Sequence, residues 1–481
     1  MPSFFLPANG KAKTAGAKRG VKRGPRKHVD EKEAKMSRRK RQLAATEISS
    51  DEEDSVGNDA AMSAGSDAEY DDVHERNYRQ AKELLAKLEE TKKEDEDLGQ
   101  LLKEDAAQKA GTLRRELADL ANINEEREID YRSHRFSPVA VAVSPCKQFI
   151  VSAGKESSIV KYSISEQKVV GVIKRTKKGG LEQKAHFGHI FAVAISSDGR
   201  YIVSGGHDST LKVWDFKTLE HVRDFGGHRG PITALTFQLK TNYLFSASRD
   251  RSVKLWDLDQ MGCVDTMYGH EDAVLSISCL QKQRSVSTGA QDRSCRLWKV
   301  EDESQLMFTG HSSCVSMDCV AMLNDDHFVS GSSDGTLCVW SVWKKRPIAT
   351  KQLIHGKHDS GEPRWVVSVA AVPYSDLVAT GSSDGQLRLW KVSNNFRSLE
   401  EVISYSMDGF INEIRFSPDG RLLVLAVGQE HKYGRWWVNK EARNQVVVLP
   451  VRYGDQDELE TSTSIQVDRL AMASSDEEED D

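Results

Sequence analysis

A tryptophan recurs at a fixed interval through the middle of this 481-residue chain. The first three intervals are each 42 residues and the fourth is 50. An aspartate precedes each tryptophan by six residues. The tryptophans are Trp214, Trp256, Trp298, Trp340 and Trp390, and the aspartates are Asp208, Asp250, Asp292, Asp334 and Asp384. A period of this length predicts an array of similar supersecondary units, each of which buries its apolar face against its neighbours.

Residues 189–226 show how one unit is built. The stretch FAVAIS alternates apolar and polar residues, as a half-buried strand does. The Asp-Gly pair in SSDGR provides the positive φ that a hairpin turn needs. The stretches YIVSG, LKVWDF and HVRDF predict three more strands. Four-stranded units of this length that end in tryptophan are typical of WD-repeat β-propellers, so the predicted fold class is all-β.

Two degenerate units flank the five clear ones. In the first unit, Glu156 and Tyr162 stand where the aspartate and the tryptophan are expected, and in the last unit Glu430 and Trp436 do so. Seven units then cover residues 133–455. This total predicts one closed seven-bladed propeller, in which closure removes the exposed strand edges of an open array.

Complete WD units resemble one another in a buried hydrogen-bond set of His, Ser/Thr, Asp and Trp. A buried carboxylate needs such donors, since it is costly to bury without them. The predicted sets are His189, Ser204, Asp208 and Trp214; His228, Ser246, Asp250 and Trp256; His270, Thr288, Asp292 and Trp298; and His311, Ser330, Asp334 and Trp340. The sixth unit keeps Thr380, Asp384 and Trp390, with its histidine left unassigned. Because only the aspartate of His207-Asp208-Ser209 has equivalents in the other units, we interpret that triplet as structural.

The N-terminal region separates its charges sharply. Residues 1–45 hold fourteen Lys/Arg and three Asp/Glu, whereas residues 46–75 hold eleven acidic residues and no Lys or Arg. With few large apolar residues, residues 1–71 are predicted to be a disordered basic and then acidic tail. Its two basic clusters favour a bipartite nuclear import signal or a nucleic-acid-binding arm over a merely solvated tail. The import residues are Lys18, Arg19, Lys22, Arg23, Arg38, Arg39, Lys40 and Arg41.

Two further segments lie outside the repeats. Residues 72–127 are rich in strong helix formers and are predicted to be a charged helical segment that contacts another protein or the propeller flank. Residues 456–481 form an acidic C-terminal tail. Serines followed by acidic residues predict phosphorylation at Ser49, Ser50, Ser474 and Ser475.

Several function classes find no support. The seven cysteines form no C-x-x-C pair, which predicts free thiols and no metal site. We expect no cofactor, because no glycine-rich phosphate loop or HExxH motif is present, and for the same reasons the chain is not expected to be an enzyme. No apolar run is long enough for a membrane span, so no membrane contact is expected.

Beyond the repeats, the chain resembles the U3 small nucleolar RNA-interacting WD-repeat proteins of ribosome biogenesis. The matching stretches are EDESQLMFTGH (301–311), KKRPIA (344–349), DLVATGS (376–382) and VGQEHKYGRWWVNKEARNQVVVLP (427–450). The resemblance implies a nucleolar component of the U3 particle. Such a protein binds the B/C motif of U3 snoRNA together with a small kink-turn-binding protein and supports pre-rRNA processing. The N-terminal helix would contact other assembly factors.

Basic residues near the loops at one end of the strands are the candidate RNA contacts, because phosphates attract Lys and Arg. They are Lys155, Lys174, Arg175, Lys177, Lys178, Lys184, Arg229, Arg249, Arg251 and Arg293. The alternative is that these are ordinary surface charges. Phe187 or Trp365 could stack on a base. A rival hypothesis, a generic nuclear scaffold or ubiquitin-ligase substrate receptor, is disfavoured because the third strands lack the Trp-Asp-x-Arg ending of those receptors.

Overall fold

The computed structural model describes residues 106–107, 113–123, 128–175, 184–310, 314–358 and 360–454. In these residues the chain forms seven antiparallel sheets, six of them built from four consecutive strands. Each sheet is one blade, and its first strand is the innermost.

The bounds of the strands follow the repeats. Blade one is β3 (Pro138–Val143), β4 (Phe149–Gly154), β5 (Ile159–Ser163) and β6 (Lys168–Ile173). Blade two is β7 (Ile190–Ile195), β8 (Tyr201–Gly206), β9 (Leu211–Asp215) and β10 (His221–Phe225). Blade three is β11 (Ile232–Phe237), β12 (Tyr243–Ser248), β13 (Ser252–Asp257) and β14 (Gly262–Tyr268). Blade four is β15 (Ser276–Cys279), β16 (Arg284–Thr288), β17 (Ser294–Lys299) and β18 (Ser304–Thr309).

The remaining blades complete the set. Blade five is β19 (Met317–Asn324), β20 (His327–Ser332), β21 (Leu337–Ser341) and β22 (Lys344–Lys351). Blade six is β23 (Ser368–Ala371), β24 (Leu377–Gly381), β25 (Gln386–Val392) and β26 (Leu399–Ser406). Blade seven combines β27 (Phe410–Phe416), β28 (Leu422–Gly428) and β29 (Gln445–Tyr453) with two short strands from before blade one, β1 (Ala121–Ile123) and β2 (Ile129–Tyr131).

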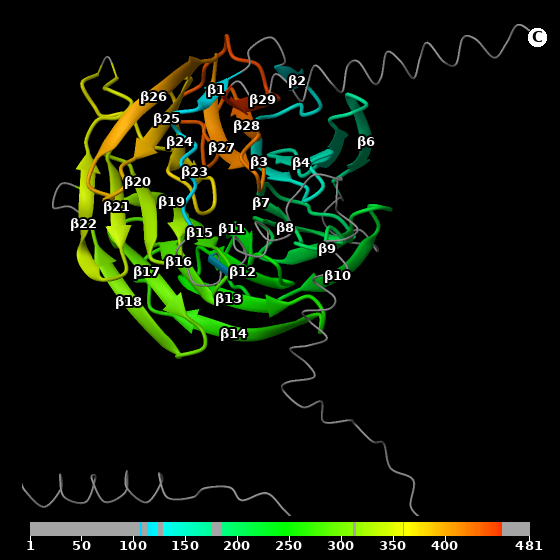
Figure 1. The fold of residues 1–481 in the computed structure, drawn as a ribbon. Helices are drawn as coiled ribbons and strands as arrows, with labels where there is room; N and C mark the ends of the chain where they lie inside the picture. The colour runs from blue at the N-terminus through cyan, green and yellow to red at the C-terminus, as the bar shows by residue number, and fades with distance from the viewer. Residues whose placement is uncertain are drawn as a thin grey trace, which may run out of the picture. The chain divides into compact units, whose positions relative to one another are not determined.

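The innermost strands form a closed ring. Strands β3, β7, β11, β15, β19, β23 and β27 contact one another in that order, and β27 contacts β3 again. Figure 1 shows these strands at the centre and β10, β14, β18 and β22 on the outside. The predicted seven-bladed WD-repeat propeller is therefore confirmed.

Burial within a blade explains the residue pattern of its strands. In blade one the second and third strands are buried except at Phe149, whereas β6 is mostly exposed. Neighbouring blades cover both faces of the middle strands, which therefore read as near-continuous apolar or small-residue runs. The outermost strand borders solvent, and β6 exposes Val169, Val170 and Val172 there.

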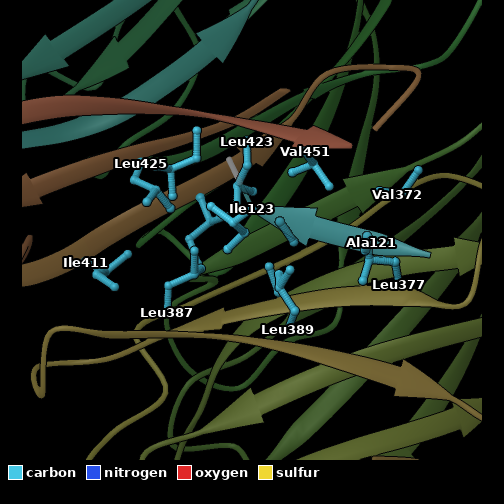
Figure 2. Packing of buried hydrophobic residues seen from close by; sticks show 14 of the residues in the cluster. Ala121, Ile123, Val372, Leu377, Leu387, Leu389, Ile411, Leu423, Leu425 and Val451 are labelled. Atoms are coloured by element: carbon cyan, nitrogen blue, oxygen red, sulfur yellow. The ribbon is translucent and has the colours of Figure 1, made fainter. Parts of the chain in front are cut away.

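The ring closes through strands from both ends of the described chain. Both β1 and β2 pair with β29, with Ile123 opposite Val451 and Tyr131 opposite Val446. Figure 2 shows Ile123 of β1 in an apolar cluster contributed by blades six and seven. Residues 72–127 were predicted to be helical, but β1 lies inside this range. The described residues 113–123 form a strap and a strand rather than a helix, while Ala106 and Ala107 are helical.

The strap before β1 is held by blade six. The Arg115 amide donates to the Tyr374 carbonyl at 2.8 Å, and the Asp376 carboxylate accepts from the Leu117 and Ala118 amides at 2.8 and 3.1 Å. The Arg114 guanidinium donates to the Val392 carbonyl at 2.8 Å. These contacts hold the chain just before β1, which then pairs in blade seven.

In the described part of the chain, no helix is long and apolar enough to cross a membrane.

Candidate nucleic-acid interface

A chain of buried hydrogen bonds ties the loops of a regular blade to its strands. In blade three, Trp256 Nε1 donates to Ser246 Oγ at 2.8 Å, and Ser246 Oγ lies 2.8 Å from His228 Nε2. His228 Nδ1 lies 2.9 Å from Asp250 Oδ2. A carboxylate only accepts, so Nδ1 carries the proton and Nε2 accepts from the serine. Burial alone would raise the pKa of Asp250, but bonds from His228, Ser252 and the Arg229 amide lower it.

Blade two contains the same chain, but its histidine is His186. His186 Nδ1 lies 2.6 Å from Asp208 Oδ2, and its Nε2 lies 2.7 Å from Ser204 Oγ, which accepts from Trp214 at 2.9 Å. The prediction of His189 is wrong. His189 Nδ1 instead donates to the Lys155 carbonyl of blade one at 2.5 Å. The physical reason is the length of chain between the two residues. In blades two, three and four the bonded histidine and aspartate are 22 residues apart, and His189 is closer than that to Asp208 in the sequence.

Blade four shows a second correction, at the hydroxyl position. Trp298 Nε1 donates to Ser287 Oγ at 2.7 Å, and His270 Nε2 lies 2.7 Å from the same oxygen. Thr288 was predicted for this role, but its Oγ1 is buried without a hydrogen-bond partner in the described residues. Ser287 pairs with Arg296 across the sheet, just as Ser246 pairs with Lys254. The turn before β17 is one residue longer than that of blade three, which moves the serine back by one.

Blade six keeps the complete set, whereas the structure describes only part of the set in blade five. Trp340 Nε1 donates to Ser330 Oγ at 2.8 Å, and Asp334 accepts from Ser332 and from the Thr336 amide. His311 lies outside the described residues. In blade six, the unassigned histidine is His355, which lies 2.9 Å from Asp384 and 3.1 Å from Thr380, and Trp390 donates to Thr380 at 2.8 Å.

Blade one rebuilds the chain with other side chains. His134 bridges Glu156 and Ser152, both at 2.8 Å, so glutamate replaces aspartate as predicted. Bonds from His134, Ser158 and the Arg135 amide outweigh burial and lower the pKa of Glu156 to about 2. Tyr162 occupies the tryptophan position, but the donor to Ser152 is the Tyr131 hydroxyl at 3.1 Å. Tyr131 comes from β2 and stacks on Tyr162 at 4.0 Å.

Blade seven has apolar contacts in place of this hydrogen-bond network. Val448 pairs with Val424 in the register in which Trp214 pairs with Ile202 in blade two. Ala426 then occupies the serine position, and it is fully buried. The prediction of Trp436 in the third strand is wrong, because that strand is β29 and Trp436 lies before it with 62% of its surface exposed. Residues 429–444, between β28 and β29, therefore form a long insertion, which we call the channel loop.

The channel loop reaches across the mouth of the ring. The Tyr433 hydroxyl donates to the Leu275 carbonyl before β15 at 3.3 Å, and its ring lies 5.8 Å from the Phe191 ring of β7. Lys432 Nζ donates to the Val367 carbonyl before β23 at 3.2 Å. The Arg249 guanidinium of blade three lies 5.0 Å from the Tyr433 ring. The loop is thus attached to blades two, three, four and six.

Glu430 anchors the first part of the channel loop. Lys155 Nζ donates to its carboxylate at 3.0 Å, and Arg435 Nε lies 2.9 Å away. The Glu430 amide donates to Ser137 Oγ at 3.2 Å, and its carbonyl accepts from Asn412 at 3.1 Å. Burial lowers the pKa of Lys155, while the hydrogen bond to Glu430 opposes that shift.

Aromatic rings gather at the channel loop. Trp365 lies 5.1 Å from Trp437, 6.1 Å from Trp436 and 5.7 Å from His431, measured between ring centroids. Burial and the charges of Lys432 and Lys155 lower the pKa of His431 to about 3. The imidazole is therefore neutral near pH 7, and its Nδ1 accepts from the Tyr433 amide at 3.2 Å.

The predicted RNA contacts divide into two groups. In an antiparallel blade, the connection before the first strand and the turn between the second and third strands lie at the same end, which we call the loop face. Lys155 and Arg249 contact the channel loop and help to hold it. The exposed predicted cations on the loop face are Lys174, Arg175, Lys184, Arg229, Arg251 and Arg293. Lys177 and Lys178 lie outside the described residues.

The other predicted sites fall where the structure gives no description. The import residues between Lys18 and Arg41, and the serines Ser49, Ser50, Ser474 and Ser475, lie outside the described residues. In the part that is described, no group of three or more His, Cys, Asp or Glu could hold a metal ion. All seven cysteines are unpaired thiols.

Comparison with known proteins agrees with the repeats and identifies the family. The model of the WD domain, G-beta repeat matches residues 181–215, 219–257, 261–299, 302–341 and 352–391. U3 small nucleolar RNA-interacting protein 2 of Mus musculus is 46% identical over 393 residues, which cover 79% of this chain and 82% of the relative. The chain belongs to the U3 small nucleolar RNA-interacting protein 2 family. The Homo sapiens relative of that name is 45% identical with the same coverage.

Solved structures and a shorter match extend this family assignment. The structure titled "Structure of U3-55K" has a TM-score of 0.65 and 39% identity, and covers 68% of this chain and 100% of that one. "Crystal structure of RRP9 WD40 repeats" also has a TM-score of 0.65 and 39% identity, with 69% and 100% covered. Ribosomal RNA-processing protein 9 of Saccharomyces cerevisiae is 33% identical over 178 residues, or 30% of each chain.

Proposed function

We propose that this protein is a non-catalytic component of the U3 small nucleolar ribonucleoprotein that binds U3 snoRNA through its loop face and supports pre-rRNA processing. The names of its relatives, U3 small nucleolar RNA-interacting protein 2 and Ribosomal RNA-processing protein 9, support the RNA and the process. The finer proposal is binding at the B/C motif together with a kink-turn-binding protein, with small-subunit assembly factors contacting the region before the propeller.

The backbone conformation of two arginines supports the loop face as the RNA-binding surface. Arg251 and Arg293 follow the turn aspartates of blades three and four with φ of 70° and 55°. Blades five and six place Gly335 and Gly385 at this position, where positive φ needs no side-chain compromise. Blades one and two place serines there. A non-glycine residue in this conformation destabilises the fold, and neither arginine side chain makes a hydrogen bond or ion pair to the described residues. This supports selection for an outside anion such as phosphate.

The test reverses the charge of three exposed cations. Changing Arg229, Arg251 and Arg293 to Glu should abolish recovery of U3 snoRNA with the protein, because like charges repel phosphates. Arg249 is left intact, since it supports Tyr433. A matched control changes Lys344, Lys345 and Arg346 to Glu at the opposite end of blade five, and it should recover RNA normally. Normal recovery by the loop-face variant would refute this interface.

A milder variant separates binding from folding. Changing Arg251 and Arg293 to Gly should relieve backbone strain of about 1 kcal/mol at each turn while weakening RNA binding. Thermal denaturation and RNA titration of the same preparation measure both effects. A variant that is more stable and binds RNA as well as the wild type would contradict the proposed role of these arginines.

The nuclear and nucleolar location is proposed on the same grounds. The relatives' association with U3 RNA and rRNA processing supports it, and so does the basic composition of residues 1–45. Deleting residues 1–45 should disperse a fluorescently tagged protein from nucleoli. Unchanged nucleolar signal would remove that segment from the import mechanism.

A further inference from the structure

We propose that Trp436 and Trp437 of the channel loop form a platform on which unpaired bases of the bound RNA stack. This inference rests on the proposed RNA-binding function and assigns a second kind of contact to the same face. The cations of the loop face would hold phosphates, and the two indoles would select single-stranded RNA over duplex.

The exposure of these rings separates them from the repeat tryptophans. Trp436 and Trp437 are 62% and 37% exposed, and Val438 beside them is 47% exposed. The network tryptophans of blades two to six are at most 4% exposed. Two adjacent exposed indoles lose the hydrophobic stabilisation that burial would give them, so a ligand that covers them would recover it.

The rings support one another from behind. Trp365 packs against both Trp436 and Trp437, His358 lies 4.8 Å from Trp437, and His431 lies 5.8 Å from Trp436. These centroid separations are those of aromatic rings in direct contact, with no room for a ligand between them. The arrangement fits a platform of solvent-exposed rings supported by other rings, and it does not fit a cage that encloses a methylated ammonium group.

The charge around the platform matches a nucleic acid. The channel loop carries four cations and two carboxylates, a balance of +2, namely Lys432, Arg435, Lys440, Arg443, Glu430 and Glu441. Arg435, next to Trp436, is 67% exposed although it pairs with Glu430. Aromatic rings that alternate with cations are how proteins bind single strands, because every base has a face to stack and every nucleotide a phosphate to neutralise.

The platform is held before any ligand arrives. Glu430, Lys432 and Tyr433 attach the loop to other blades by the bonds described above, and the Asn439 amide donates to the Gln429 carbonyl at 2.9 Å. Gln429 Nε2 also donates to the Ala442 carbonyl at 2.8 Å. Preorganised rings lose little conformational entropy on binding, which favours stacking on them over stacking on a loose loop.

The experiment measures RNA affinity of the full-length protein at several salt concentrations, with a U3 snoRNA transcript and a fully base-paired RNA of equal length. Trp436→Ala should weaken binding of the transcript about tenfold or more, in the range for loss of one stacked base. The slope of log affinity against log salt should stay unchanged, because no phosphate contact is lost. Binding of the duplex should be unaffected, and Trp436→Phe should restore most of the affinity.

Controls separate this inference from the function on which it rests. Trp343→Ala removes an 80% exposed indole at the opposite end of blade five and should change nothing. If the wild type binds neither RNA, the proposed function fails. If the wild type binds the transcript and Trp436→Ala binds it equally well, the platform is refuted while the phosphate contacts stand. If Trp436→Ala loses as much affinity for the duplex as for the transcript, base stacking is refuted. Base stacking is also refuted if Trp436→Ala binds RNA normally but no longer binds a protein partner.

Discussion

Blades two, three, four and six each contain a histidine, a hydroxyl, an aspartate and a tryptophan in one buried chain of hydrogen bonds. Blades one and seven, which meet where the ring closes, do not. In blade one the Tyr131 hydroxyl of β2 donates to Ser152 in place of an indole. In blade seven Val448 and Ala426 occupy the tryptophan and serine positions. The network is thus one of several ways to hold a blade together, and blade seven uses apolar side chains in its place.

The difference also locates the unusual surface. In a regular blade the turn after the second strand is short, because the aspartate within it bonds back to the histidine. In blade seven Glu430 bonds to Lys155 and Arg435 instead, and the channel loop, from Gln429 to Asn444, extends across the mouth of the ring. Residues freed from the network therefore form the exposed aromatic and basic face.

The largest expected effect concerns tryptophans inside and outside the network. Trp340 is fully buried against Phe308 and Phe328, so Trp340→Ala should lower the free energy of unfolding by about 4 kcal/mol. Trp436→Ala should change it by less than about 0.5 kcal/mol. Chemical denaturation of both variants checks this contrast. A similar cost for the two would mean that the channel loop is part of the core.

The next effect distinguishes the two histidines of blade two. His186→Ala would leave the buried Asp208 without its donor and should cost about 3 kcal/mol. His189→Ala removes one bond to the Lys155 carbonyl and should cost about 1 kcal/mol. The same denaturation measurement ranks them. The reverse ranking would show that His189 is the network residue.

The smallest effect tests the substitution in blade one. Tyr131→Phe removes the hydroxyl that donates to Ser152 and should cost about 1 kcal/mol. Tyr162→Phe keeps the stacked rings and should be nearly neutral. A larger cost for Tyr162→Phe than for Tyr131→Phe would indicate that Tyr162, and not Tyr131, replaces the indole donor.

The sequence predicted the parts of this fold that depend on local periodicity. The tryptophans and aspartates follow from the spacing within each blade, and the ring of seven follows from the number of repeats. The prediction missed His186 because His189, like His228 and His270, directly follows a glycine, although the 22-residue spacing to the aspartate identifies His186. Ser287 was missed because an added turn residue leaves Thr288 at the usual distance from Trp298.

The ring closure and the channel loop depended on pairing between distant segments. The three residues of β1 and of β2 carry no strand signal by themselves, and they become strands only by pairing with β29. The third strand of blade seven could have been found from the β-branched run at its start, because Gln445–Tyr453 contains Val446, Val447 and Val448. The contact of the loop with five other blades has no signature in the sequence.

Ultraviolet crosslinking of the full-length protein to U3 snoRNA, followed by mass spectrometry of the crosslinked peptides, tests the RNA-binding account most directly. We expect crosslinks in the channel loop, especially at Trp436 and Trp437, and in the turns that contain Arg251 and Arg293. Crosslinks confined to the outer strands, or to the opposite end of the blades around Trp343, would contradict the account.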